Sequence, residues 1–294
     1  MTLEMPIREY VPLKEFCTFG IGGPARYLLE VRKIEEMQQA IVWCRTMSIP
    51  YLVIGKGSNC LFDDKGYNGT VIINKIEFLE ETIPGTFHVG SGYSFALLGV
   101  QTARKGWSGL EFASGIPASV GGAVFMNAGA NGMETSQTLI SVDFVNENGI
   151  FETLPKENLL FSYRHSPFQQ RKGAVVGATF TLKKNPEARS QQISIVNKRT
   201  QTQPYGTMSA GCIFLNPACG HAGALIEKSG LKGYKVGGAQ VSHVHANFLI
   251  NTGSATCEEM QALISTVKSQ VKEQTGVELH SEVRYIPSEG VEWQ

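Results

Sequence analysis

Apolar and polar positions near the N-terminus follow two different periods. Residues 25–31, ARYLLEV, form an apolar run of strand length, and residues 51–55, YLVIG, form a second such run directly after Pro50. Between them, residues 33–47 carry apolar side chains at the spacing of a helix face: Ile34, Met37, Ile41, Cys44 and Met47. The pattern predicts a strand, a helix and a strand, the β-α-β unit that joins parallel strands.

The hydrophobic pattern changes beyond residue 70. Short apolar runs alternate with glycines, a helix is expected over Phe95–Arg104, and strands are expected in residues 139–146 and 174–184. The polar stretch KNPEARSQQ marks a boundary near residues 185–190. The chain is thereby divided into three predicted regions: residues 1–70, 71–188 and 189–294.

The third region again mixes strands with helices. A strand is expected in residues 246–251, and a closing strand in residues 281–287. Between these strands lies an amphipathic helix with four apolar side chains on one face: Met260, Leu263, Val267 and Val271. Strands and helices in every region predict an α+β protein.

Composition narrows the function classes. The 26 basic and 26 acidic residues balance, so the chain carries no charge signature of binding to nucleic acid or an anionic membrane. The N-terminal segment lacks the pattern of a signal peptide, and no apolar run is long enough to span a membrane. We therefore expect a soluble cytoplasmic protein with no nucleic-acid or membrane partner.

Cysteines and histidines do not form a metal-binding pattern. The six cysteines contain no C-x-x-C pair, and His243 and His245 lack a third ligand at a useful spacing, so no metal site is predicted. A single cysteine such as Cys212, in MSAGCIFLNP, usually behaves as a small buried apolar residue. Assigning chemistry to Cys212 requires partners from elsewhere in the chain.

Two glycine-rich stretches are candidate ligand sites. GKGSN follows an apolar strand at residues 55–59, and its backbone amides could cradle a phosphate. It matches neither a P-loop nor the G-x-G-x-x-G of a Rossmann fold, because Cys60 stands where the third glycine is needed. A second stretch, SGIPASVGGAVFMNAGANG, covers residues 114–132. Together they favour a long ligand with a pyrophosphate; the alternatives are a plain turn and close helix–strand packing.

Seven sequence blocks together resemble one bacterial enzyme family, the UDP-N-acetylenolpyruvoylglucosamine reductases. The blocks cover almost the whole chain in the family's order and spacing: TFGIGGPARYL, GKGSNCLFDD, GLEFASGIPASVGGAVFMNAGANG, YRHSPF, SAGCIFLNP, AGALIEKSGLKGYKVGGAQVSHVHANFLIN and LHSEVRYI. The resemblance implies an FAD-binding fold of the vanillyl-alcohol oxidase (PCMH) type, made of two α+β subdomains, with a C-terminal α+β substrate-binding domain. The last strand is expected to return to the FAD site.

The resemblance also implies the reaction. Non-covalent FAD and the co-substrate NADPH would reduce UDP-N-acetylglucosamine enolpyruvate, a small-molecule substrate, to UDP-N-acetylmuramate for peptidoglycan synthesis. The protein is expected to be a monomer. The implied FAD-binding residues lie in the two glycine-rich stretches: Gly55, Gly57, Ser58, Asn59, Leu61, Ser114, Gly115, Ile116, Pro117, Ser119, Gly121, Gly122, Asn127, Gly129 and Ala130.

Three residues match the family's chemical positions. Cys212 stands where the family has a serine or cysteine as proton donor, and Ser209 is a weaker competitor. Arg164 matches the arginine aimed at the substrate carboxylate and the developing enolate, for which a guanidinium fork is suited. Glu282 matches a glutamate near the same carboxyl group.

Further positions are mapped in the same way. Asn216 is expected in the UDP site, and the lysine that meets the UDP phosphates is either Lys198 or Lys232. His245 and Asn247 are expected to have structural roles on the flavin side. A tyrosine-bearing loop found in part of the family is missing here, and Tyr205 is not assigned its role.

Two other functions fit part of the pattern. An oxidase of the same flavin-binding fold would share the glycine-rich stretches but would need no proton donor at Cys212. A nucleotide-sensing module would bind UDP-sugar without turnover, and degenerate residues would then be expected at Arg164, Cys212 or Glu282. All three are intact.

Overall fold

The first lobe is a four-stranded sheet with one helix packed against it. The computed structural model describes residue 3 and residues 5–290. The sheet has the order β1-β2-β5-β3, with β1 antiparallel and the other strands parallel. Its elements are β1 (Arg8–Pro12), β2 (Pro24–Val31), α1 (Ile34–Thr46), β3 (Tyr51–Ile54) and β5 (Tyr67–Asn74). The predicted β-α-β unit is confirmed, although β5 lies between the two strands that α1 connects.

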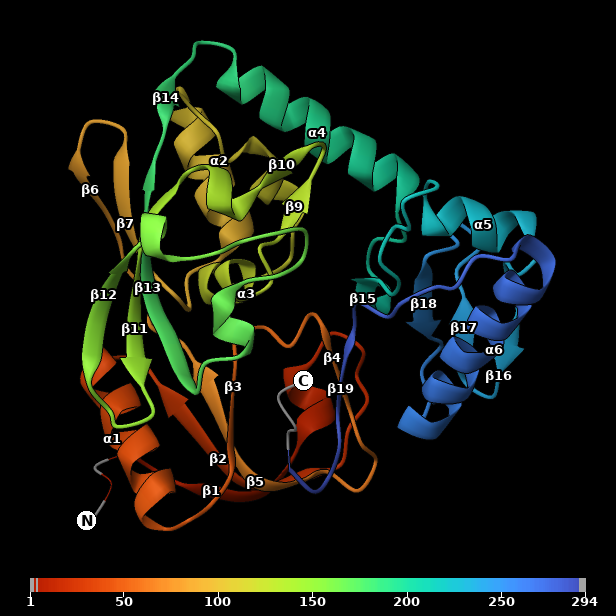
Figure 1. Cartoon of the computed structure of the whole chain (residues 1–294), viewed down its shortest axis with the longest axis horizontal. Coiled ribbons are helices and arrows are strands. Elements are labelled where there is room, and N and C mark those ends of the chain that lie inside the picture. The colour runs from red at the N-terminus through yellow and green to blue at the C-terminus, as the bar shows by residue number, and fades with distance from the viewer. Residues whose placement is uncertain (1–2, 4, 291–294) are drawn as a thin grey trace.

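The second lobe is a five-stranded antiparallel sheet with the order β12-β11-β13-β7-β6. Its strands are β6 (Leu79–Ile83), β7 (Thr86–Gly90), β11 (Leu139–Asn146), β12 (Phe151–Pro155) and β13 (Gly173–Thr181). Two helices, α2 (Phe95–Arg104) and α3 (Val120–Phe125), share the main core of this lobe. Val145, Ala174 and Val176 belong instead to the apolar cluster of α1, so α1 lies between the two sheets (Figure 1).

Several short strands lie outside the three larger sheets. They are β4 (Cys60–Phe62), β8 (Trp107–Ser108), β9 (Gly129–Ala130), β10 (Met133–Glu134) and β14 (Lys183–Lys184). Strand β8 pairs with β14, and β9 pairs with β10. Five 3-10 helices complete this part: η1 (Leu13–Phe16), η2 (Glu111–Gly115), η3 (Thr135–Gln137), η4 (Lys156–Asn158) and η5 (Pro167–Gln169).

The third lobe is a four-stranded sheet with the order β15-β18-β17-β16, against which α6 packs. Its elements are β15 (Met208–Cys212), α5 (Ala222–Lys228), β16 (Lys235–Val236), β17 (Ala239–Val241), β18 (Phe248–Asn251) and α6 (Cys257–Thr275). The predicted apolar face of α6 is buried, together with Cys257. Phe19, Ile21 and Leu61 of the first lobe enter this core and anchor the third lobe to it.

The end of the chain returns to the first lobe. Strand β19 (Arg284–Ile286) leaves the third lobe and pairs in parallel with β4, beside the first glycine-rich stretch (Figure 1). Each residue of β19 therefore has a fixed register against residues 60–62. The end of the chain, after the third lobe, is thus held next to residues 55–59.

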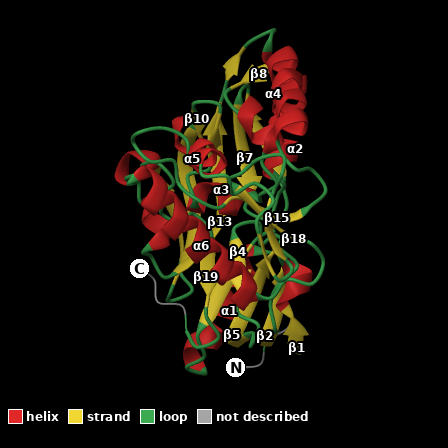
Figure 2. Cartoon of the chain, turned by 90° about the vertical axis from the view of Figure 1, so that its right-hand side faces the viewer, coloured by secondary structure: helices red, strands yellow, loops and turns green. Residues whose placement is uncertain are grey.

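The observed elements shift the expected region boundaries. Strand β5 continues to Asn74, so a division after residue 70 would cut a central strand of the first sheet. Helix α4 (Ala188–Thr202) packs against α2 and η2 of the second lobe, as Figure 2 also shows for α2, although the third region was expected to begin at residue 189. The third lobe's own sheet begins only with β15. In the described part of the chain, no helix combines the length and the apolar character needed to cross a membrane.

Candidate active site

The two glycine-rich stretches meet in space. A Cβ on Gly55 would lie 2.0 Å from Oγ of Ser119, so the first stretch approaches the second as closely as a glycine permits. Ser119 is buried, and its Oγ accepts a hydrogen bond from the Gly122 amide at the start of α3. On the other side, Lys56 Nζ donates to Ser94 Oγ at 2.9 Å. The stretches therefore form one continuous surface.

Buried hydroxyl groups without partners border this surface. Among the described residues, the hydroxyls of Thr18, Ser91 and Ser114 are shielded from solvent and have no hydrogen-bond partner. The Thr18 amide donates to the Gly57 carbonyl, and a Cβ on Gly121 would lie 2.9 Å from Cβ of Ser91. A buried polar group without a partner is costly and usually indicates a missing ligand or water. Hydroxyl groups without partners, next to glycine backbone that a ligand can approach closely, suit a long ligand such as FAD.

The other expected cofactor residues lie in or next to β4, η2 and β9. Asn59 donates from Nδ2 to the Glu282 carbonyl and accepts from the Arg284 amide, so it joins the first stretch to β19. Leu61 is buried on β4, and Ser58 is half-buried. Three residues follow or end η2, namely Gly115, Ile116 and Pro117, and two form β9, namely Gly129 and Ala130.

The side chain of Asn127 supports the chain around Arg164. Its side-chain amide donates to Glu134 and to the Ser162 carbonyl, both at 2.9 Å, and its Oδ1 accepts from the Ser136 amide at 3.0 Å. The side chain is fully buried and makes these bonds within the chain. Asn127 therefore supports the segment that carries Arg164, two residues beyond Ser162.

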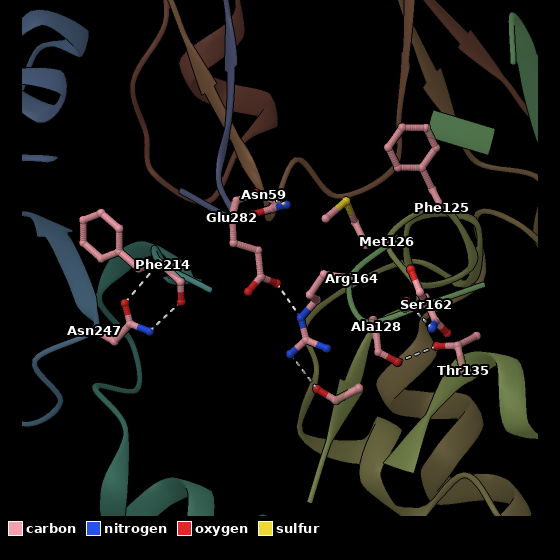
Figure 3. A network of polar contacts seen from close by, with 12 residues as sticks. Asn59, Phe125, Met126, Ala128, Thr135, Ser162, Arg164, Phe214, Asn247 and Glu282 are labelled. Atoms are coloured by element: carbon pink, nitrogen blue, oxygen red, sulfur yellow. Dashed lines mark hydrogen bonds and ion pairs between the residues drawn. The ribbon is translucent and has the colours of Figure 1, made fainter. Parts of the chain in front are cut away.

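Arg164 and Glu282 form an ion pair across the site. Nε of Arg164 donates to Oε1 of Glu282 at 2.7 Å (Figure 3), and its Nη2 donates to the Gly129 carbonyl at 3.0 Å. Only 19% and 15% of the two side chains are exposed, so solvent screens the pair weakly. Arg164 has a positive φ of 56°, unusual for a residue with a side chain and a sign of local strain. The site thus orders a guanidinium and a carboxyl group from distant parts of the chain.

Burial favours the neutral forms of the acids. It raises the pKa of Glu282, although the adjacent Arg164 lowers it. Burial also raises the pKa of the Cys212 thiol to about 11; the charge of Glu282 acts in the same direction, and Arg199 and Arg164 oppose it. Cys212 is therefore protonated at neutral pH and can donate a proton, and Glu282 is close enough to act on it electrostatically.

Local backbone geometry places Cys212. The pairing of β15 with β18 shifts register between Ser209 and Cys212, and Gly211 between them has a φ of 78°, which favours glycine. The segment after the thiol is clamped by Asn247, whose side chain exchanges two hydrogen bonds of 2.9 Å with the backbone of Phe214 (Figure 3). Asn247 therefore has a structural role beside the Cys212 strand.

The remaining candidates lie in the third lobe. Asn216 is exposed, and its Oδ1 accepts from the Ala222 amide at the start of α5. His245 accepts from the Asn247 amide through Nδ1, and burial followed by the charge of Lys232 lowers its pKa. Lys232 itself pairs with Glu227 at 2.7 Å, whereas Lys198 is exposed on α4.

Two residues of the site escaped the sequence analysis. Arg199 approaches Gly115 and acts electrostatically on Cys212, and Arg284 stacks over the ring of Phe125 at 4.9 Å beside the cofactor surface. Arg284 was visible in SEVRYI, two residues after Glu282, where the alternation of a strand places both on one face. No comparable signal marked Arg199.

The contact between Gly55 and Ser119 yields a stability prediction. Gly55→Ala should lower the free energy of unfolding of the FAD-free protein by roughly 1 to 3 kcal/mol, because the added methyl group overlaps Ser119 and disturbs the α3 cap. Urea denaturation measures this change. Gly122→Ala is the matched control, since its Cβ would meet Ser119 Oγ only at 3.4 Å. Equal stabilities of the two variants would show that the stretches do not meet as described.

Comparisons with known proteins agree with this geometry. Residues 25–154 match the family of FAD binding domains, and residues 203–286 match the family described as "UDP-N-acetylenolpyruvoylglucosamine reductase, C-terminal domain". The reductase of Protochlamydia amoebophila is 61% identical over 94% of this chain and 92% of its own length. That of Chlamydia trachomatis serovar A is 49% identical over 96% of both chains.

A solved structure shows the same fold. The crystal structure of UDP-N-acetylenolpyruvylglucosamine reductase from Thermus caldophilus matches with a TM-score of 0.82 and 36% identity, and the match covers 96% of this chain and all of that one. The likeness therefore includes both the glycine-rich surface and the lobe that carries Cys212. On these grounds the chain belongs to the UDP-N-acetylenolpyruvoylglucosamine reductase family.

Proposed function

We propose that Arg164, Glu282 and Cys212 carry out the substrate chemistry of a flavin-dependent reductase. As a member of its family, the protein is an FAD- and NADPH-dependent oxidoreductase of peptidoglycan synthesis, which reduces UDP-N-acetylglucosamine enolpyruvate to UDP-N-acetylmuramate. The main support for assigning the chemistry to these residues is that the Arg164–Glu282 pair lies beside the thiol on β15, because the Glu282 amide donates at 2.7 Å to the carbonyl of Ile213, the residue after Cys212.

The glycine-rich surface would hold the cofactor. Backbone amides near Gly55 and Gly57 suit its pyrophosphate, and the unpaired hydroxyls of Thr18, Ser91 and Ser114 suit its polar edges. The chemistry that bound FAD would supply there is the passage of a hydride from NADPH to the terminal CH2 carbon of the enolpyruvyl group. Asn59 and β19 would place this surface next to Glu282.

Arg164 and Glu282 would orient the substrate and stabilise charge. Negative charge develops on the enolate of the substrate as its double bond is reduced, and Arg164 is a fixed cation that can bind the substrate carboxylate through two hydrogen bonds. Glu282 holds the guanidinium group of Arg164 by accepting a hydrogen bond from its Nε. Because burial raises the pKa of Glu282, its protonated form can also donate a hydrogen bond to an enolate oxygen.

Cys212 would complete the reaction as the proton donor. Its S–H bond breaks, a C–H bond forms at the carbon that bears the carboxylate, and the electron pair of the S–H bond stays on sulfur. The thiol is protonated at neutral pH, as a general acid must be before it acts. Ser209 is separated from Cys212 by the bulge of β15 and stays a weaker candidate.

The cofactor proposal predicts a yellow protein that releases its flavin. Acid precipitation should leave FAD in the supernatant, because we propose non-covalent binding. NADPH should then bleach the flavin absorbance of the native protein, and the enolpyruvyl substrate should restore it. Flavin that stays in the precipitate would support a covalent oxidase, and a colourless protein that cannot be reconstituted with FAD would overturn the cofactor site.

We also propose that the protein acts as a monomer in the cytoplasm. Residues of a single chain supply the ion pair and the thiol, and each of the six cysteines, all in the described residues, is free, as suits a reducing compartment. A light-scattering mass of two chains would contradict the monomer.

Asn216, with either Lys198 or Lys232, would bind the UDP part of the substrate.

A further inference from the structure

Asn251 joins the third lobe to a segment of the first lobe that borders the cofactor surface. It lies on β18, opposite Met208 of β15, and it is buried. Its Nδ2 donates to the Phe19 carbonyl at 2.9 Å. Its Oδ1 accepts from the amides of Gly253 and Ala255 at 2.8 and 2.9 Å. Both polar atoms of this buried side chain are therefore bonded, and one of the bonds crosses to another lobe.

The segment that Asn251 binds contacts two parts of the molecule at once. The Thr18 amide donates to the Gly57 carbonyl at 3.3 Å, on the side of the first glycine-rich stretch. The ring of the next residue, Phe19, lies instead in the core of the third lobe. A Cβ on Gly20 would come within 2.8 Å of Sδ in the first residue of β15, so the segment also touches that strand directly. Residues 18–20 therefore link the first glycine-rich stretch to β15.

Strand β15 is tied to the first glycine-rich stretch at both of its ends. Its first residue lies opposite Asn251, and its last residue is Cys212. Just beyond that end, the Ile213 carbonyl accepts from the Glu282 amide at 2.7 Å. The Glu282 carbonyl accepts in turn from Asn59 Nδ2 at 3.1 Å. The two ties reach the stretch at residues 57 and 59, so together they fix where the thiol lies relative to it.

We propose that Asn251 is a positioning residue that holds the Cys212 strand against the cofactor surface through its bond to the Phe19 carbonyl. This inference rests on the proposed role of Cys212. A general acid must come within about 3 Å of the group that it protonates. A displacement of about 1 Å can cost 10²-fold in rate, even when its cause lies far from the chemistry. Because Asn251 acts at the far end of β15, loss of its bond would move the thiol without removing a group that touches the substrate.

Asn251→Asp tests this proposal in the FAD-loaded enzyme. The change keeps the shape of the side chain and an acceptor for the two amides, but it places an oxygen against the Phe19 carbonyl, where repulsion replaces a hydrogen bond. Reoxidation of the reduced enzyme by substrate should slow by roughly tenfold to 10²-fold, whereas reduction by NADPH should stay nearly normal. Iodoacetamide should alkylate Cys212 several-fold faster, because a loosened strand exposes the thiol more often. Peptide mass spectrometry measures the alkylation rate at each cysteine.

Asn74→Asp is the matched control, because Asn74 makes the same kind of contact between two other lobes. It is similarly buried, its Nδ2 donates at 3.0 Å to the Val175 carbonyl of the second lobe, and its Oδ1 accepts from the Ile76 amide. The change should lower the free energy of unfolding in urea to a similar degree. It should nevertheless leave both reoxidation and the alkylation rate of Cys212 unchanged. The exposed Cys219 should react alike in all variants.

A second variant keeps the test decisive if Asn251→Asp does not fold. Asn251→Ser retains a hydroxyl that can accept from the amide two residues on, but its side chain is too short to reach the Phe19 carbonyl, so it should change the same two rates. A parental alkylation rate at Cys212 in the folded variants would overturn the proposal, and so would equal effects of Asn251→Asp and Asn74→Asp. Full turnover of Cys212→Ala would instead overturn the role of Cys212, because the alkylation rate reports the position of the strand whatever the thiol does.

Discussion

Cys212→Ala should lose roughly 10² to 10⁴-fold in turnover, the range usual for a positioned general acid. The variant keeps the ion pair between Arg164 and Glu282, so the substrate carboxylate and the developing charge remain supported. What the variant lacks is the thiol that gives a proton to the carbon bearing the carboxylate. Steady-state assays with NADPH and the enolpyruvyl substrate measure the loss.

Two variants control this experiment. Cys212→Ser should retain partial activity, because a hydroxyl can occupy the same place as a weaker acid. Cys219→Ala removes an exposed thiol and should behave like the parent protein. If Cys212→Ala turns over at the parental rate, Cys212 is a small apolar residue of the strand and another group supplies the proton.

Arg164→Lys should slow reoxidation of the reduced enzyme by substrate by roughly 10²-fold, in line with the removal of one preorganised donor. Lysine keeps the positive charge but cannot bond Glu282 and the Gly129 carbonyl through two nitrogens while it also binds a carboxylate through two bonds. Reduction by NADPH should stay nearly normal, because it precedes substrate chemistry. Stopped-flow absorbance separates the two half-reactions.

Arg171→Lys is the matched control for this variant. Arg171 is exposed and stacks over Phe144, so its replacement should leave both half-reactions unchanged. Equal damage to both half-reactions in Arg164→Lys would contradict the proposed role and would indicate misfolding or a part in NADPH binding. The positive φ of Arg164 adds no penalty to the comparison, since lysine and arginine have similar backbone preferences.

Local periodicity predicted the elements well where one face is buried. The helix over Phe95–Arg104 and the apolar face of α6 follow directly from the spacing of their apolar residues. Strand order could not be predicted in the same way. Strand β5 lies between β2 and β3 although α1 connects those two, because backbone pairing over long distances leaves no mark in a local pattern.

The site depended even more on long-range contacts. Arg164 and Glu282 are 118 residues apart, and only the resemblance to a family placed them together in advance. The side-chain contacts of Asn127 could not be predicted either, because its buried amide bonds to the Ser162 carbonyl, 35 residues away. Arg199 was missed because an arginine in a polar helix resembles a solvated one, until its contact with Gly115 is known.

The central claim, that Cys212 delivers the proton after hydride transfer, is tested most directly by hydrogen exchange. Reduced Cys212→Ala protein is mixed with the enolpyruvyl substrate in D2O, and mass spectrometry follows the terminal CH2 group of the unreacted substrate. If hydride transfer occurs and reverses without proton delivery, deuterium should enter that group while little UDP-N-acetylmuramate forms. Product formation at the parental rate, with no deuterium in the remaining substrate, would contradict the account.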